Sequence, residues 1–318
     1  MMSSPKTHPP EKTVLVLTGP TGVGKTGLSL AIAKKLPVEI VSADSRQIYR
    51  YMDIGTAKPD SKVREQVPHH FIDILNPDQD YSAGAFANAA RQTISEILMR
   101  GKIPLVVGGA GLYIQALLVG FFKSDVKDLA LREWLYQRLE KEGIDKLYAE
   151  LKKVDRESAQ KTHPNNVKRV IRALEVYLAS GEPLSQLQKA HQDPAPFPWV
   201  EIALFCQRQL LYRQINQRVE KMFERGLVAE VQRLLNMGYS PTLNSLNSVG
   251  YKEVIAYLQD EMDLFNCKEL VKQNTRRYAK RQLTWLRGDK DVNWLELNAD
   301  NKSTSQVAEQ ILEEFNIW

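Results

Sequence analysis

GPTGVGKT, residues 19–26, matches the phosphate-binding pattern GxxxxGK[ST] at every fixed position. The apolar, β-branched run Thr13–Thr18 precedes it, and a segment with Leu28, Ile32 and Leu36 on one helical face follows it. This order of strand, loop and helix favours phosphate binding over a plain glycine turn that packs a helix on a sheet. We predict a P-loop that holds phosphate through backbone N–H groups and a lysine, made of Gly19, Pro20, Thr21, Gly22, Val23, Gly24, Lys25 and Thr26. The Thr26 hydroxyl is expected to be a ligand of Mg²⁺.

Short apolar runs alternate with helical segments on both sides of this loop. We predict further strands at Val38–Ser42, His70–Ile74, Ile103–Val107 and Glu201–Phe205, and a late strand at Val292–Leu297. Strands that alternate with helices predict an α/β fold, in which a parallel sheet is flanked by helices.

A second region has a different character. Residues 123–198 are rich in Leu, Lys, Glu and Arg and contain no strand-like run, so we predict an all-helical insertion domain there. The P-loop core is expected to occupy residues 13–122 and to resume at 199–318, where it ends in basic helices.

The composition is typical of a soluble globular protein. The 318 residues are 43% hydrophobic and 25% charged, and 43 Lys and Arg against 38 Asp and Glu give a net charge of +5. Cys206 and Cys267 lie far apart, which argues against a zinc site and favours a reducing compartment. The uncharged stretch Ile103–Phe122 is long enough to span a membrane, but Pro104 and its glycines predict a strand, a turn and a helix. We therefore expect a cytoplasmic protein without a membrane segment. We also expect it to be a monomer.

The loop by itself predicts phosphate binding and leaves the phosphate's carrier open. A kinase or NTPase needs a second acidic Mg²⁺ ligand at a strand end, and Asp73 is the candidate. The alternative is that Asp73 caps a turn. A non-catalytic RNA-binding protein that retains the loop is a further alternative.

Two segments after the second predicted strand resemble the signature of the tRNA dimethylallyltransferase family. They are SADSRQIY at 42–49 and MDIGTAKP at 52–59. Further matches are HHFIDI at 69–74, YSA at 81–83, VGG at 107–109, GLY at 111–113, RALEV at 172–176, VGY at 249–251 and KRQLTWLR at 280–287. The resemblance implies transfer of the dimethylallyl group of dimethylallyl diphosphate to N6 of the adenosine 3′ of the anticodon in tRNA. The P-loop would then hold a diphosphate leaving group.

The resemblance also implies roles for single residues. Asp44 matches the catalytic base, which must take a proton as the weakly nucleophilic adenine amine attacks. From position alone, Asp44 could equally be the N-cap of a helix over Ser45–Tyr51. Arg218 matches a residue that reaches the diphosphate together with the P-loop Lys25, although from sequence alone it could be a solvated helix arginine. Ala110 departs from the family, which usually has Thr or Ser there, and its glycine neighbours are expected to leave room for a larger side chain.

The tRNA-binding residues that the resemblance implies fall in five groups. They are Asp44, Ser45, Arg46 and Gln47; Ala110; Lys168, Arg169, Val170, Ile171 and Arg172; Asn247, Ser248, Val249, Gly250, Tyr251 and Lys252; and Lys280, Arg281, Gln282, Leu283, Thr284, Trp285, Leu286 and Arg287. Residues 268–290 hold eight Lys and Arg against two Asp and Glu, which favours contact with phosphates. The alternative is a solvated amphipathic helix. The helical insertion is expected to clamp the anticodon arm.

Overall fold

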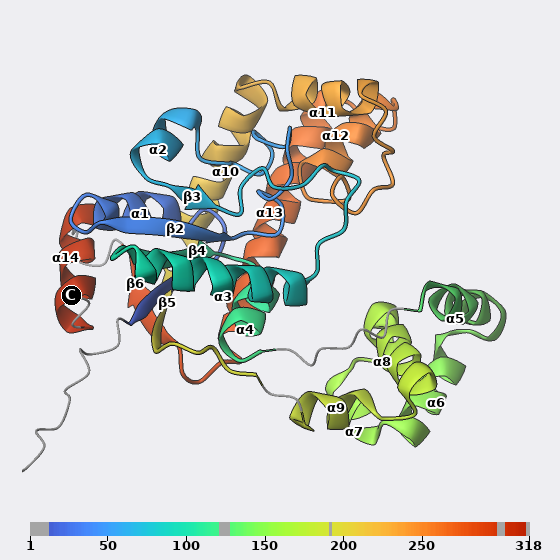
Figure 1. Ribbon diagram of the computed structural model, residues 1–318. Helices are drawn as coiled ribbons and strands as arrows, with labels where there is room; N and C mark the ends of the chain where they lie inside the picture. Colours follow the sequence, from blue (N-terminus) through green and yellow to red (C-terminus); the bar gives the residue numbers. More distant parts are fainter. Residues whose placement is uncertain (1–12, 121–127, 191–192, 298–302, 316–318) are drawn as a thin grey trace, which may run out of the picture. The chain divides into compact units, whose positions relative to one another are not determined.

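The computed structural model describes residues 13–120, 128–190, 193–297 and 303–315 (Figure 1). The chain divides into two compact units. The core unit comprises Met1–Leu118 and Ala195–Trp318, and the helical unit comprises Val119–Pro194. The sequence placed the corresponding insertion at 123–198.

A six-stranded parallel sheet forms the centre of the core unit, which confirms the predicted α/β class. The strand order is β3-β2-β4-β1-β5-β6. The strands are β1 Val14–Thr18, β2 Val38–Ala43, β3 His69–His70, β4 Ile103–Gly108, β5 Trp199–Phe205 and β6 Asn293–Glu296.

The third strand is shorter than the sequence predicted. We expected His70–Ile74, but β3 ends at His70. Phe71 and Asp73 both adopt positive φ angles, of 63° and 56°, which are incompatible with an extended strand.

Nine helices are described in the core unit. They are α1 Lys25–Ala33, α2 Ser61–Gln66, α3 Ala83–Met99, α4 Gly111–Leu118, α10 Arg208–Glu224, α11 Leu227–Asn236, α12 Tyr251–Leu258, α13 Leu264–Leu286 and α14 Thr304–Glu314. Side-chain caps fix where several of them begin: Ser82 accepts a hydrogen bond from Ala85 N at the start of α3, and Asp263 accepts one from Asn266 N at the start of α13. None of the described helices is both long enough and apolar enough to cross a membrane.

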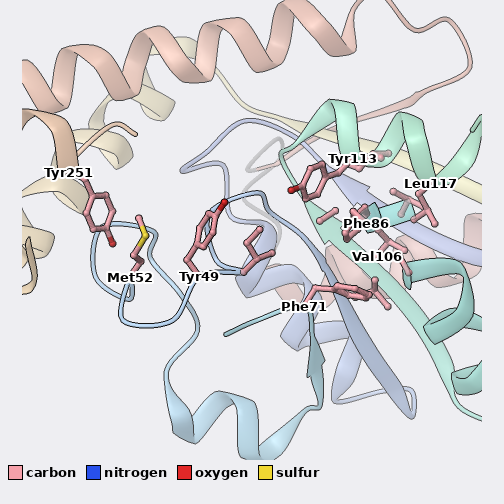
Figure 2. Packing of buried hydrophobic residues seen from close by; sticks show 14 of the residues in the cluster. Tyr49, Met52, Phe71, Phe86, Val106, Tyr113, Leu117 and Tyr251 are labelled. Atoms are coloured by element: carbon pink, nitrogen blue, oxygen red, sulfur yellow. The ribbon is translucent and has the colours of Figure 1, made fainter. Parts of the chain in front are cut away.

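Alternate residues of strands β1, β2 and β4 belong to two separate hydrophobic cores. Val16 of β1 and Val106 of β4 face a cluster with α3 and α4, whereas Leu17 and Leu105 face α1 and α14 (Figure 1). In the first cluster, the rings of Phe86 and Tyr113 stack with centroids 4.6 Å apart. Figure 2 shows these two rings beside Phe71 and Val106, while Tyr251 lies near Met52 in another part of the same cluster. The sheet is thus covered by helices on both faces, as is usual for a parallel sheet.

The helical unit has a core of its own. Its helices are α5 Leu129–Glu142, α6 Ile144–Val154, α7 Arg156–Lys161, α8 Val167–Ser180 and α9 Leu184–Ala190. Leu135, Leu147, Leu151 and Leu174 are fully buried between them. Asp155 is also buried, and it accepts hydrogen bonds from the backbone and hydroxyl groups of Ser158 and Ser185. The described residues of this unit form no strand, in keeping with an all-helical insertion.

Candidate active site

The sheet topology gathers three loops at one edge. Strands β2, β4 and β1 are neighbours and parallel, so their carboxyl ends lie side by side. The P-loop follows β1, Ala110 follows β4, and Asp44 follows β2. The Ala110 N–H donates to the Ala43 carbonyl over 3.2 Å, which ties two of these loops together.

The P-loop adopts the conformation that its glycines permit. Gly19 has a φ of 141°, and a Cβ atom at this position would lie 2.6 Å from the Leu204 carbonyl oxygen. Lys25, the first residue of α1, donates from Nζ to the carbonyl oxygens of Gly19 and Pro20, over 2.7 and 2.9 Å. Thr26 follows in the exposed first turn of the helix. The loop therefore offers a helix N-terminus, a lysine and a hydroxyl at one place.

Two cations share this region with one carboxylate. Burial lowers the pKa of Lys25 to about 7. The nearby Asp44 carboxylate raises this pKa in part, and the positive charge of Arg218 lowers it further. Burial also lowers the pKa of the Arg218 guanidinium, and Asp44 opposes that effect. Arg218 forms no hydrogen bond with any residue that the structure describes. Poorly solvated cations without a full set of partners favour the binding of an anion.

Asp44 is held by one of its two carboxylate oxygens. Oδ1 accepts hydrogen bonds from the backbone N–H groups of Arg46 and Gln47, over 2.8 and 3.3 Å. Residues 45–48 form a turn, so Asp44 does not cap the helix that was the alternative interpretation. Within the described parts of the chain, Oδ2 has no hydrogen-bond partner. This oxygen is free to accept a proton from a bound substrate.

An aromatic cleft of about 570 Å³ opens beside these groups. One face of α13 forms a wall of the cleft, because residues three and four apart lie on the same side of a helix. Burial, followed by the nearby Asp44, raises the pKa of Tyr278 to about 12, so this phenol stays protonated at neutral pH. The cleft is lined by Thr18, Ser45, Arg46, Tyr49, Tyr81, Ser82, Ala83, Gly109, Ala110, Gly111, Leu112, Tyr113, Asn244, Tyr278, Arg281, Gln282, Trp285 and Leu286. Its size and its mixture of rings and polar groups suit a flat heteroaromatic ligand.

Arg218 itself lines a second cavity, of about 340 Å³. The other lining residues are Ile54, Ala57, Gln214, Gln217, Lys221, Met222 and Arg225. The half-buried Arg218 is therefore part of a cavity wall and not a fully solvated helix arginine.

Asp73 has a structural role that replaces its proposed role as a Mg²⁺ ligand. Its Oδ1 accepts a hydrogen bond from Lys58 Nζ over 2.5 Å, and its Oδ2 accepts one from Arg64 over 2.7 Å. Because both carboxylate oxygens bind cations of the chain itself, the kinase or NTPase alternative loses its second acidic ligand.

Comparison with known proteins agrees with this site. The sequence matches the family model described as IPP transferase over residues 47–289. It is 41% identical over 309 residues to the tRNA dimethylallyltransferase of Natranaerobius thermophilus, covering 96% of this chain and 93% of that protein. It is 45% identical over 299 residues to the enzyme of the same name from Pelotomaculum thermopropionicum, covering 92% and 94%.

Solved structures give the same result. The tRNA isopentenylpyrophosphate transferase of Bacillus halodurans superposes with a TM-score of 0.71 at 38% identity, covering 96% of this chain and 97% of that one. A eukaryotic dimethylallyltransferase acting on tRNA superposes with a TM-score of 0.79 at 31% identity, covering 96% and 79%. The chain belongs to the tRNA dimethylallyltransferase family. The resemblance drawn from the sequence motifs is thereby confirmed.

As a tRNA dimethylallyltransferase family member, the chain has some of its predicted RNA-binding residues at open positions. Ser45, Arg46, Ala110, Arg281 and Trp285 line the aromatic cleft. Other predicted residues are exposed elsewhere: Lys168, Arg169, Asn247, Lys252, Lys280, Thr284 and Arg287. Their contacts with RNA stay predictions.

Several other predicted RNA-binding residues are turned toward the protein. Gln47 Nε2 donates to the carbonyl oxygens of Thr56 and Ala57, and Arg172 pairs with the buried Glu175 over 3.0 Å. Val170, Ile171, Gly250, Tyr251, Gln282 and Leu286 are buried, and Ser248, Val249 and Leu283 are partly buried. Gln282 and Leu286 nevertheless line the aromatic cleft, whereas a direct contact between RNA and the other buried side chains would require local rearrangement.

The sequence motifs did not assign roles to some residues that shape the site. Tyr278 lines the cleft, and its spacing from Arg281, Gln282 and Trp285 is the signal that would have found it. Glu230 is 2% exposed, and it accepts hydrogen bonds from the backbone N–H groups of residues 53–55 and from the Tyr251 hydroxyl. Sequence spacing carries no signal for Glu230, because its partners lie far away along the chain.

Proposed function

We propose that the protein transfers the dimethylallyl group of dimethylallyl diphosphate to N6 of the adenosine 3′ of the anticodon in tRNA. One observation carries the proposal: a carboxylate with an unpaired oxygen lies within electrostatic range of Lys25 and Arg218, beside the aromatic cleft. Such a site combines an acceptor for the amine proton with cations for a diphosphate.

The transfer requires two changes at one carbon atom. A bond forms between adenine N6 and C1 of the dimethylallyl group, while the bond from C1 to the diphosphate oxygen breaks. The electron pair of the broken bond stays on the diphosphate, where Lys25, Arg218 and the P-loop N–H groups stabilise the added charge. Asp44 Oδ2 accepts the N6 proton, since the amine is too weak an acid to lose it beforehand.

The donor set fits Mg²⁺ bound mainly through the diphosphate. The described residues contain no group of three or more His, Cys, Asp or Glu that could hold a metal. Thr26 supplies a hydroxyl beside the P-loop, and Mg²⁺ commonly binds through one such ligand, substrate phosphates and water. A Mg²⁺ ion held there would supply positive charge to the diphosphate.

The adenosine must leave its stack to reach Asp44. Tyr278 and Trp285 offer partly exposed rings at the cleft, on which an extruded base can stack. The exposed cations of α13, together with Lys168 and Arg169 of α8, would contact the phosphates of the anticodon arm. We further propose that the protein acts as a monomer in the cytoplasm.

Mass spectrometry of nucleosides tests the reaction. Unmodified tRNA incubated with the protein, dimethylallyl diphosphate and Mg²⁺ should gain one C5H8 unit on the adenosine 3′ of the anticodon. Asp44→Asn should reduce the single-turnover rate by roughly 10²–10⁴-fold while tRNA affinity stays within a few-fold, because an amide keeps the shape and cannot take the proton.

Other outcomes would contradict the proposal. Hydrolysis of ATP without any transfer would support a kinase or NTPase, and tRNA binding without transfer would support a non-catalytic RNA-binding protein. An Asp44→Asn variant that keeps most of its rate would refute the assignment of the base.

A further inference from the structure

A single amide connects the P-loop to the wall of the aromatic cleft. Gln282 of α13 is 9% exposed. Its Oε1 accepts a hydrogen bond from Thr21 N in the P-loop, and its Nε2 donates one to the Gly109 carbonyl after β4, both over 2.8 Å. The side chain thus satisfies two backbone groups, from loops 88 residues apart in the sequence, at the same time.

The position selects for an amide. One end of the side chain must accept and the other must donate, and the primary amide of Gln or Asn offers both groups on one carbon atom. A Cβ atom at Gly109 would collide with Gln282 Nε2, so the loop lies directly against the amide. Gln282 is also a neutral, inward-facing residue next to the exposed Arg281. These features argue against a direct contact with RNA as its main role.

The same helix carries the residues that face the ligand. Tyr278, Arg281 and Trp285 lie on the cleft side of α13, within one turn of Gln282. Trp285 also lies against Gly111, at the start of α4. Gln282 and Trp285 therefore hold this wall of the cleft in a fixed orientation relative to the P-loop and to the segment after β4.

We propose that Gln282 is a positioning residue that couples occupancy of the P-loop to RNA binding in the cleft. A diphosphate in the P-loop reduces the motion of that loop. The hydrogen bonds from Thr21 to Gln282 and from Gln282 to Gly109 then reduce the motion of α13. RNA consequently binds to a cleft wall that is already ordered, which lowers the entropic cost of binding. The coupling is reciprocal, so bound RNA strengthens diphosphate binding by the same factor. This inference rests on the proposed function, because it requires a diphosphate in the P-loop.

The coupling is measured with two probes on the full chain. Inorganic pyrophosphate with Mg²⁺ represents the leaving group, and a fluorescent anticodon stem-loop RNA represents the acceptor. Anisotropy gives the Kd of the RNA with and without saturating pyrophosphate, and calorimetry gives the Kd of pyrophosphate with and without saturating RNA. We expect wild-type protein to bind each probe about fivefold or more tightly when the other is present.

Two variants and one control locate the coupling. Gln282→Met removes both hydrogen bonds at similar volume, and Gln282→Glu keeps the acceptor for Thr21 N but loses the donor to Gly109. Both should bring the coupling factor to within twofold of one, because both contacts are needed. Gln273→Met makes the same change at an exposed position of α13 and should retain the wild-type coupling. Using two variants keeps the test decisive if Gln282→Met does not fold.

A purely structural role predicts a different result. Equal weakening of both probes with the coupling factor unchanged would overturn the proposal, as would a wild-type factor of one. A wild-type protein that binds RNA but not pyrophosphate would refute the proposed function, and the coupling with it. The proposal is established if both Gln282 variants lose the coupling while Gln273→Met retains it.

Discussion

Burial of Lys25 changes the charge that this residue can present to a bound diphosphate. Its ammonium lies against the P-loop carbonyls, and burial lowers its pKa to about 7. The GxxxxGK[ST] pattern predicted the position of this lysine, but not its lowered pKa, which depends first on burial in the folded loop and then on the nearby Asp44 and Arg218.

The pKa of Lys25 predicts how diphosphate binding depends on pH. A bound diphosphate favours the charged ammonium, so above pH 7 the neutral lysine must take up a proton on binding. Affinity should therefore fall as the pH rises from 7 to 8.5, by up to about tenfold per unit. Calorimetry with pyrophosphate in buffers of different ionisation enthalpy measures this proton uptake.

Lys25→Arg is the matched variant, because arginine stays charged throughout this range. Titration of pyrophosphate itself is the same for both proteins, so any difference between their pH profiles belongs to Lys25. Identical profiles would show that Lys25 is already charged in the free protein.

Ala110 stands where the sequence resemblance led us to expect Thr or Ser, and the structure changes our expectation for it. Ala110 precedes α4, and its carbonyl accepts from Tyr113 N and Ile114 N, as the carbonyl of an N-cap residue does. Its glycine neighbours do not leave open space as expected, because Gly109 lies against Gln282 and Gly111 against Trp285. A hydroxyl at this position would therefore cap a helix as well as face the cleft.

Ala110→Thr should stabilise the protein by about 1 kcal/mol, through a new N-cap. The transfer rate should rise or stay unchanged, since the side chain borders the cleft. Ala110→Val, which adds similar bulk without a hydroxyl, is the control for both measurements. A denaturant midpoint that shifts equally in the two variants would refute the capping role, and lost activity in a folded threonine variant would show a site built around alanine.

The sequence predicted helices and strands correctly where the local residue pattern alone determines the structure. The apolar runs of β1, β2, β4 and β5 marked those strands, and helical periodicity marked α13. It failed at β3, because Phe71, directly after His70, adopts a positive φ; Asp73 does so as well, and its ion pairs with Lys58 and Arg64 come from residues that the local pattern does not include. It also missed the inward orientation of Gln282, because the partners of that side chain come from other loops.

The exposed face of α13 carries cations that can bind the phosphates of RNA. Arg277 and Arg281 are exposed, and Arg281 reaches the cleft. Replacing both with Ala should weaken binding to all tRNAs alike and reduce the slope of log K against log salt by nearly one unit for each phosphate that the helix no longer neutralises. Lys272→Ala on the same helix is the control, because Lys272 already pairs with Glu220 and Glu269. An unchanged slope in the double variant would show that this face meets only solvent.

The whole molecule consists of two units with separate cores, and this separation makes the role of the helical unit testable. The P-loop, Asp44 and Arg218 all belong to the core unit, so the proposed chemistry needs no side chain from the helical unit. The sequence predicted that this unit clamps RNA. Only part of the predicted contact surface is exposed, because Val170 and Ile171 are buried in the core of the unit and Arg172 pairs with Glu175.

Lys168 and Arg169 remain as the exposed cations of that surface, at the start of α8. Replacing both with Ala should lower the affinity for tRNA and reduce its salt slope by up to about two units, while pyrophosphate affinity stays unchanged. The stability of the unit should not fall, because both side chains lie outside its core. Lys152→Ala with Lys153→Ala on α6 removes the same charge from the same unit and serves as the control. If the two double variants weaken tRNA binding equally, the unit contributes only its overall charge. If neither has an effect, the helical unit does not clamp the anticodon arm through α8.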